Sequence, residues 1–230
     1  MNIENIFISL KSRNFALFFS GQLVSRIGMW MQRTAIIWLV YSLTDSVFMV
    51  GVTTFAEQFP SFLFSIRGGI IADKYNRYKV LMITQILSAL QAIVLTAFAF
   101  SGNYSITLIL ILSVFLGIVN AYDVPVRQSM INEIIEHKED LTNAIALNSS
   151  LNTLARLIGP ALSGFVLVKY GAANCFLANA ISFIAVIAAI AAMKFPENTF
   201  SSHKGKTKGT FKEALIYLSE NKPIAIIIWI

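Results

Sequence analysis

The sequence predicts an all-α membrane protein: a six-helix transmembrane bundle followed by the start of a seventh helix. Its composition is too apolar for an ordinary soluble domain, with 56% hydrophobic and only 13% charged residues among 230. Several apolar runs reach the roughly 20 residues that a helix needs to cross a bilayer. Because lipid offers no partner to backbone amides, continuous runs of this length indicate helices rather than barrel strands.

Six apolar runs divide the chain, and each is taken as one spanning helix. They are Phe15 to Tyr41, Val47 to Ile66, Val80 to Phe100, Ile106 to Tyr122, Ala144 to Val168, and Ala172 to Met193. Residues 15–193 therefore form the predicted domain, after a cytoplasmic segment at 1–14 from which no leader peptide is expected to be cleaved. Residues 194–222 are a polar linker, either solvated or in contact with anionic lipid. Residues 223–230 begin a seventh helix, so the chain is expected to be truncated.

The basic residues outside these runs predict the orientation. They gather in the N-terminal segment, the second and fourth connections and the tail, whereas the first, third and fifth connections contain only Lys169. Cytoplasmic loops carry the excess of Lys and Arg in membrane proteins. We therefore expect a multi-pass protein of the cell inner membrane with a cytoplasmic N-terminus.

The same composition argues against several other classes. The net charge of +6 lies in loops without a basic, aromatic face, so nucleic acid is not an expected partner. The single Cys175 excludes an intramolecular disulfide and a cysteine-based metal site. No nucleophile with its base, metal cluster or phosphate loop is apparent, so neither an enzyme nor a cofactor or metal is expected.

Charged residues inside the predicted spans are costly and indicate function. Polar positions recur at helical spacing in three spans: Gln22, Arg26, Met29 and Arg33 in the first; Thr54, Gln58, Ser61 and Ser65 in the second; Asn148, Asn152, Arg156, Pro160 and Ser163 in the fifth. Such stripes predict a shared polar cavity. The residues expected to bind substrate or couple protons there are Arg26, Arg33, Glu57, Asn152 and Arg156.

Arg33 and Glu57 are expected to lie at the same depth, about 14 to 17 Å from the outer surface at 1.5 Å per residue. They can therefore pair. One interpretation is a buried ion pair that only orders the bundle. The other makes Glu57 a carboxylate that exchanges a proton during a conformational change.

The segment Gly69 to Lys79 is predicted to be a short charged loop between the second and third spans. Gly69, Asp73, Lys74 and Arg77 match the pattern Gly-x-x-x-Asp-Arg/Lys-x-Gly-Arg-Arg/Lys, which resembles the signature loop of major facilitator superfamily transporters. Asn76 stands where Gly is usual, and it tolerates the left-handed backbone that Gly would adopt. Tyr78 replaces a base, which Lys79 supplies one residue later.

The fourth span is followed by Asp123, Pro125 and Arg127, and Pro125 is expected to end or kink the helix. Asp123 and Arg127 are either a weak local surface pair or part of a charge latch. In the second case they would meet Asp73 and Arg77 on the cytoplasmic face and hold an inner gate closed.

The fifth span contains Gly159, Pro160 and Gly164. Small residues allow close helix packing, and Pro bends a helix. The stretch is also similar to the Gly-Pro-x-x-Gly-Gly motif of the antiporter branch of the superfamily, with Ser163 in place of one Gly. Plain packing and a role in proton-driven export are both consistent with it.

Further stretches are similar to the bacterial branch that includes enterobactin exporters and macrolide and multidrug efflux proteins. They are Gly21 to Ser25, Trp30 to Arg33, Ala56 to Pro60 and Asp123 to Gln128. The resemblance implies the first half of a twelve-helix transporter that works by alternating access. Its expected partners are a small amphiphilic substrate, protons, the lipid bilayer and a missing C-terminal half.

One departure concerns the coupling mechanism. The family's fourth-helix Arg, four residues before a Gly, would fall at Ser113 if Gly117 is that Gly, so coupling through this position is in question. The alternative to an exporter is a truncated, non-transporting membrane protein or a six-helix module that needs a partner chain.

Overall fold

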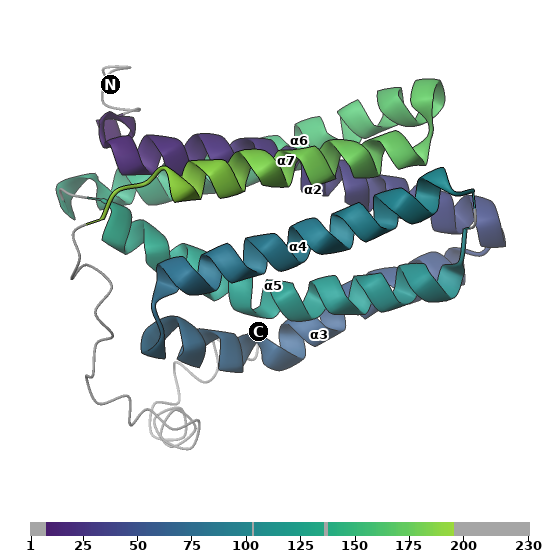
Figure 1. Ribbon diagram of the computed structural model, residues 1–230, viewed down its shortest axis with the longest axis horizontal. Helices are drawn as coiled ribbons and strands as arrows, with labels where there is room; N and C mark the ends of the chain where they lie inside the picture. Colours follow the sequence, from purple (N-terminus) through teal and green to yellow (C-terminus); the bar gives the residue numbers. More distant parts are fainter. Residues whose placement is uncertain (1–7, 103, 136–137, 196–230) are drawn as a thin grey trace, which may run out of the picture.

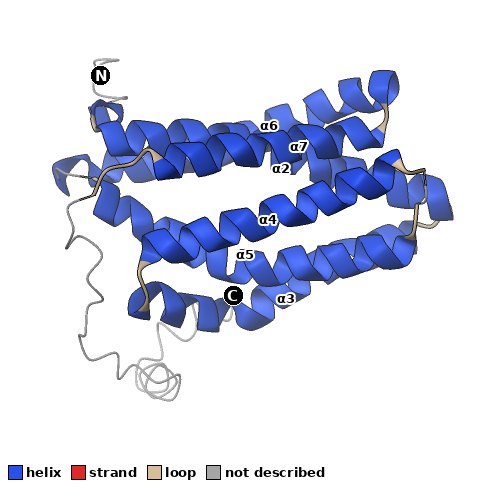
Figure 2. Cartoon of the chain, viewed as in Figure 1, coloured by secondary structure: helices blue, strands red, loops and turns tan. Residues whose placement is uncertain are grey.

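The computed structural model describes residues 8–102, 104–135 and 138–195, and within these ranges every regular element is helical (Figures 1 and 2). Short 3₁₀ segments are η1 (Ile8–Lys11) and η2 (Lys138–Asp140). The long helices are α2 (Arg13–Thr44), α3 (Val47–Lys74), α4 (Arg77–Phe100), α5 (Ile106–Ile134), α6 (Leu141–Tyr170) and α7 (Ala172–Ala191). Successive helices run antiparallel. The predicted seventh helix at 223–230 and nearly all of the predicted linker lie outside the described residues.

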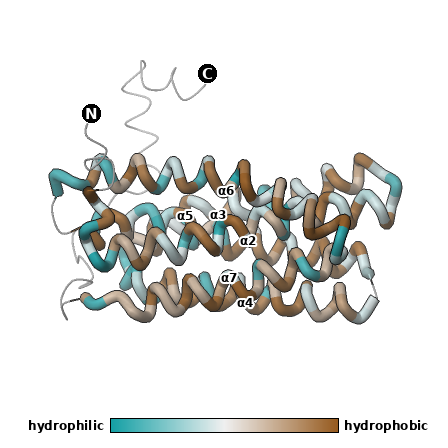
Figure 3. Tube along the Cα trace, turned by 90° about the horizontal axis from the view of Figure 1, so that it is seen from above, coloured by the Kyte–Doolittle hydropathy of each residue, from teal (hydrophilic) through white to brown (hydrophobic). Residues whose placement is uncertain are grey.

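Among the described residues, the five helices α3 to α7 are long and apolar enough to cross a membrane. Hydrophilic segments gather mainly at the two ends of the bundle, with mostly hydrophobic chain between them (Figure 3). The predicted all-α membrane class is thus confirmed. The 32-residue α2 is not among the five, because Arg26 and Arg33 interrupt its apolar runs.

Helix α3 ends later and α4 begins earlier than predicted, so the loop predicted at Gly69 to Lys79 is shorter. Helix α3 continues to Lys74, so only Tyr75 and Asn76 separate it from α4. Asn76 does not adopt the left-handed backbone expected for it: its φ is −60° and its ψ is 109°. It instead begins α4 as an N-cap, accepting a hydrogen bond of 3.1 Å from the backbone N–H of Lys79. Most of the charged segment is therefore helical.

The expectation that the fourth span ends near Tyr122 is wrong, because α5 continues through Pro125 to Ile134. A proline inside a helix leaves the carbonyl four residues earlier without its N–H partner. Here that carbonyl belongs to Ala121, and Gly68 of α3 lies directly against it. A Cβ at residue 68 would overlap the Ala121 oxygen. The helix accommodates the proline because a glycine from its neighbour fits beside it.

A reciprocal contact occurs farther along the same helix pair. Gly117 of α5 lies against the backbone carbonyl of Glu57, close to Pro60 inside α3. Each helix thus presents a glycine near the proline of the other. Small residues let helix backbones approach closely in membranes, and α3 and α5 form the most extensive helix contact of the bundle.

Helix α2 lies between the remaining helices and contacts α7, α6, α3 and α5. Two apolar clusters pack against it, one around Phe15 and Phe18 and one around Ala35 and Leu39. Buried polar side chains occupy the level between these clusters. Of the candidate functional residues, Arg26 and Asp123 belong to these buried polar side chains.

One end of the bundle, called the basic end below, joins the start of α2, the α3–α4 turn, the start of α6 and the end of α7. Ser9 binds the side chain of Asn143 there, at 2.8 Å between Oγ and Oδ1. Asn14 exchanges two hydrogen bonds with the backbone of Lys194, at 2.8 and 3.1 Å. These contacts hold the ends of three helices together.

We expect Gly68→Ala to lower the stability of the bundle by about 1–3 kcal/mol, because the added methyl group must displace the α5 backbone. Gly51→Ala is the matched control, since it makes the same change in the same helix at a position with no neighbouring atoms. Alanine favours a helix there by about 0.5–1 kcal/mol. Thermal unfolding of the purified protein measures both effects, and equal melting temperatures would contradict the packing described here.

Candidate functional site

Arg33, Glu57, Trp30 and Arg156 form a charged group, called the central cluster, between α2, α3 and α6. Nε of Arg33 lies 3.7 Å from Oε2 of Glu57, and the two side chains are 25% and 18% exposed. The structure therefore brings together the two residues that were expected at equal depth. Their pairing does not distinguish an ordering role from a role in proton coupling.

Trp30 connects both arginines of the central cluster. Its ring centroid lies 5.3 Å from Cζ of Arg33 and 5.6 Å from Cζ of Arg156, within the range of cation–π contacts. Gly159 of α6 packs against Cβ of Trp30, so the two helices are close at this level. Asn152, one turn before Arg156, is half-buried and takes part in no hydrogen bond found among the described residues.

Arg26 has neighbours other than those of Arg33, and a cavity shared by the three polar stripes stays a prediction. Arg26 lies seven residues before Arg33, or about 10 Å along the helix at 1.5 Å per residue. It lines a small pocket, called the inner pocket, between α2, α4, α5 and α7. The outer positions Gln58 and Ser65 of α3 are exposed.

The inner pocket contains the Asp123–Arg127 pair, whose charged atoms are 2.8 Å apart. These side chains are 4% and 13% exposed, so the expectation of a surface pair is wrong. Oδ1 of Asp123 also accepts hydrogen bonds from Thr84, at 2.9 Å, and from Gln85, at 2.7 Å. The pair is buried because α5 continues past Pro125 and carries both residues inside the bundle.

Asp123 and Arg127 make no ion pair with Asp73 or Arg77 in the described part of the chain. Arg77 instead pairs closely with Glu133 and, at 3.7 Å, with Asp73. Glu133 lies six residues beyond Arg127, about 9 Å farther toward the basic end. The charge group at this end is therefore built around a residue that the sequence analysis did not consider.

The remaining residues of the signature segment lie at the surface. Lys74 is exposed over the ring of Tyr75, at 5.7 Å, and Lys79 is also exposed. Among the described residues, no atom outside the adjoining part of α3 lies within 4 Å of the Cβ position of Gly69. Arg77 has the most partners of these residues: besides its two ion pairs, its Nε donates a hydrogen bond of 2.8 Å to the carbonyl of Ala72.

The antiporter-like stretch packs only in part. Gly159 lies against α2, and Oγ of Ser163 donates a hydrogen bond of 3.1 Å to the carbonyl of Met31. Pro160 lies inside α6 without ending it. Gly164 is exposed and has no neighbour at its Cβ position among the described residues. The packing interpretation thus applies to Gly159 and Ser163.

A network of neutral amides lies among the buried polar side chains between the two apolar clusters and was not anticipated. Nε2 of Gln32 donates to Oε1 of Gln91 at 3.1 Å, and Nδ2 of Asn179 donates to Oε1 of Gln32 at 2.9 Å. Ser182 in turn donates to Asn179. These contacts join α2, α4 and α7. The sequence does contain a signal for this network, since Gln32, Gln91 and Asn179 are uncharged amides inside predicted spans.

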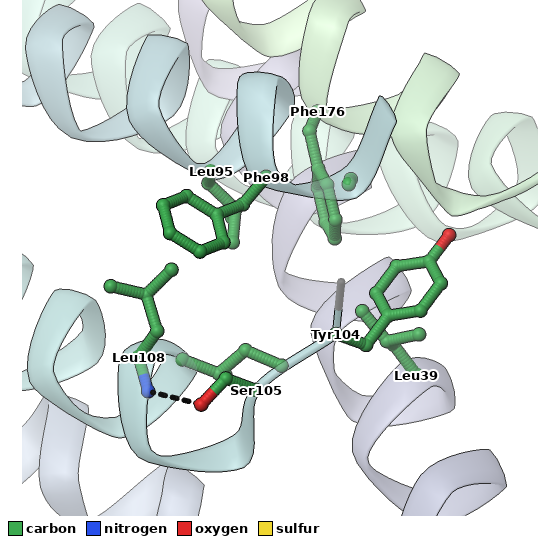
Figure 4. A pocket seen from close by; sticks show the side chains of 9 residues that line it. Leu39, Leu95, Phe98, Tyr104, Ser105, Leu108 and Phe176 are labelled. Atoms are coloured by element: carbon green, nitrogen blue, oxygen red, sulfur yellow. Dashed lines mark hydrogen bonds between the residues drawn. The ribbon is translucent and has the colours of Figure 1, made fainter. Parts of the chain in front are cut away.

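A second pocket lies near the end of the bundle opposite the basic end (Figure 4). Apolar and aromatic side chains line it, including Leu39, Leu95, Phe98 and Phe176, with Tyr104 at one side. Its lining includes no charged residue. It is therefore unsuited to the ion chemistry of the central cluster and the inner pocket.

Comparison with known proteins shows which protein family this chain resembles over nearly its whole length. Residues 5–229 match the family model described as "Transmembrane secretion effector". The staphyloferrin A transporter of Staphylococcus aureus is 33% identical over 172 residues, covering 74% of this chain and 43% of that protein. The uncharacterized MFS-type transporter YkuC of Bacillus subtilis is 25% identical over 231 residues, covering 95% and 53%.

Macrolide efflux protein A of Streptococcus pyogenes is also similar, at 23% identity over 152 residues, covering 66% of this chain and 37% of that protein. The chain spans about half the length of the curated relatives it matches.

The geometry at the basic end predicts unequal effects for two carboxylates that face one arginine. Glu133→Gln should lower the free energy of unfolding by about 1–3 kcal/mol, because it removes a close, largely buried partner of Arg77. Asp73→Asn should cost less than about 1 kcal/mol, since that side chain is 55% exposed and screened by solvent. Denaturation of both variants and of the parent in one detergent measures the difference. A larger loss for Asp73→Asn would overturn this assignment.

Proposed function

Because this chain belongs to the major facilitator superfamily of transporters, in its transmembrane secretion effector family, we propose that it forms the N-terminal half of a twelve-helix exporter. The exporter would move small amphiphilic molecules across the cell inner membrane by alternating access. The transporter family also means that the chain is not an enzyme. Its relatives include a protein named as a staphyloferrin A transporter and one named as a macrolide efflux protein, which supports export of small molecules.

The proposal takes α2 as a sixth span beside the five apolar helices. Packing against α7, α6, α3 and α5 supports this, because a helix between spanning helices must cross with them. Its polar residues face protein: Gln32 and Arg33 have partners on other helices, and Arg26 is buried. The positive charges near the basic end support a cytoplasmic N-terminus.

The observation that carries the mechanism is the ion pair of Arg33 and Glu57 in the central cluster, held inside the bundle by α2 and α3. A charged pair at this depth is expensive to bury. Protonation of Glu57 would free Arg33 for a substrate, whereas deprotonation would restore the pair. Alternation between these states can couple proton movement to the opening of the cavity, whose other wall the C-terminal half supplies.

The test replaces Glu57 in the full-length protein, reconstituted in liposomes with an imposed proton gradient. Glu57→Gln should abolish gradient-driven transport of a fluorescent amphiphile such as the anionic dye 8-anilinonaphthalene-1-sulfonate, because the amide cannot exchange a proton. Binding of the dye should remain within about threefold of the parent. Glu139→Gln is the matched control, since Glu139 is an exposed carboxylate in η2.

Two results would separate the interpretations. Full gradient-driven transport by Glu57→Gln would reduce the ion pair to an ordering role. Absence of any gradient-dependent transport by the parent protein would contradict the proposed secondary transport itself.

A further inference from the structure

We infer that the inner pocket binds an anionic group of the transported molecule through Arg26, so that the protein prefers organic carboxylates to lipophilic cations. The inference rests on the proposed transport function and specifies its substrate class. It begins from a buried guanidinium that forms no ion pair in the described part of the chain.

Arg26 is buried to 7% exposure in the middle of α2. Its Nε has no hydrogen-bond partner, and none of the ion pairs found among the described residues includes it. A guanidinium remains charged in a protein and offers five N–H donors. Leaving such a charge buried without compensation is strongly unfavourable. The inner pocket has a volume of about 20 Å³, and the oxygen atoms of a single bound carboxylate group would compensate the charge there.

Asp123, the carboxylate that lines the same pocket, already has other partners. Asp123 receives Thr84 and Gln85 on Oδ1 and pairs with Arg127 through Oδ2. The pocket therefore contains two arginines and one carboxylate, and retains one positive charge.

Neutral donors complete the lining of the inner pocket. Ser25, Ser88 and Asn120 contribute hydroxyl and amide groups beside Arg26. A planar guanidinium matches the two oxygens of a carboxylate, and such charge-assisted hydrogen bonds are stronger than neutral ones. A lipophilic cation would instead be repelled by the remaining charge.

The central cluster, two helical turns farther along α2, also contains more arginines than acids, but its Arg156 is exposed. Arg33 faces Glu57, whereas Arg156 has no acidic partner in the described part of the chain. The two places together contain four arginines and two acids. An anion that passes between them would meet a second arginine, with Trp30 available for its apolar part.

The experiment uses the full-length protein in lipid nanodiscs and measures the melting temperature during ligand titrations. The probes are benzoate, phthalate and tricarballylate, each compared with its neutral methyl ester, and tetraphenylphosphonium as a lipophilic cation. At least one carboxylate should stabilise the parent protein at concentrations at which its ester does not. Arg26→Gln should weaken that binding at least about tenfold, and Arg26→Lys should weaken it less.

Arg67→Gln is the matched control. It removes an exposed arginine of α3 that lies outside the inner pocket, and it should leave carboxylate binding unchanged. Without ligand, Arg26→Gln should melt at the same or a higher temperature than the parent, because it removes an uncompensated buried charge.

Three results would overturn the inference: no carboxylate binds better than its ester, Arg26→Gln binds as tightly as the parent, or both Arg26 variants destabilise the ligand-free protein. The last result would mean that the protein itself compensates the charge. Gradient-driven dye transport without carboxylate binding would remove this inference but leave the proposed function. Carboxylate binding without any gradient-driven transport would contradict the proposed transport function but leave Arg26 as an anion-binding residue.

Discussion

The absence of hydrogen-bonding solvent in lipid is the constraint on which this bundle depends, because a polar side chain between its two apolar clusters is costly to bury unless it finds a partner on another helix. Gln32 meets Gln91 and Asn179, and Arg33 meets Glu57. Hydrogen bonds between membrane helices contribute about 0.6 kcal/mol each on average. Several together favour one rotation of α2 over its alternatives, and that rotation directs Arg26 toward α4 and α5 and Arg33 toward α3.

Close packing determines which helices act as a unit. The glycines Gly68 and Gly117 bring the α3 and α5 backbones together beside the prolines of the opposite helix. At the basic end Arg77 of α4 pairs with residues of both α3 and α5. A motion that separated these three helices would break backbone packing and ion pairs at once. Rearrangements of the transporter are therefore expected to move them together.

The charged residues of α2 occupy two places with different surroundings. Arg33 has a carboxylate of its own and an aromatic ring beside it, which suits a switch between two pairings. Arg26 is more deeply buried, and the nearby carboxylate of Asp123 is occupied by other donors. The first arrangement is the basis for proton coupling in the proposed function. The second is the basis for the preference for anions.

The sequence by itself determined the membrane class, the order of the helices and the proximity of Arg33 and Glu57, because apolar run length and helical rise depend only on local composition. It misplaced the ends of α3 and α5, since Pro125 is accommodated by Gly68, a residue far away in the chain. Only the tertiary structure separated Arg26 from Arg33 and paired Arg77 with Glu133. Those outcomes depend on how helices rotate and approach one another, which residue spacing within one helix does not specify.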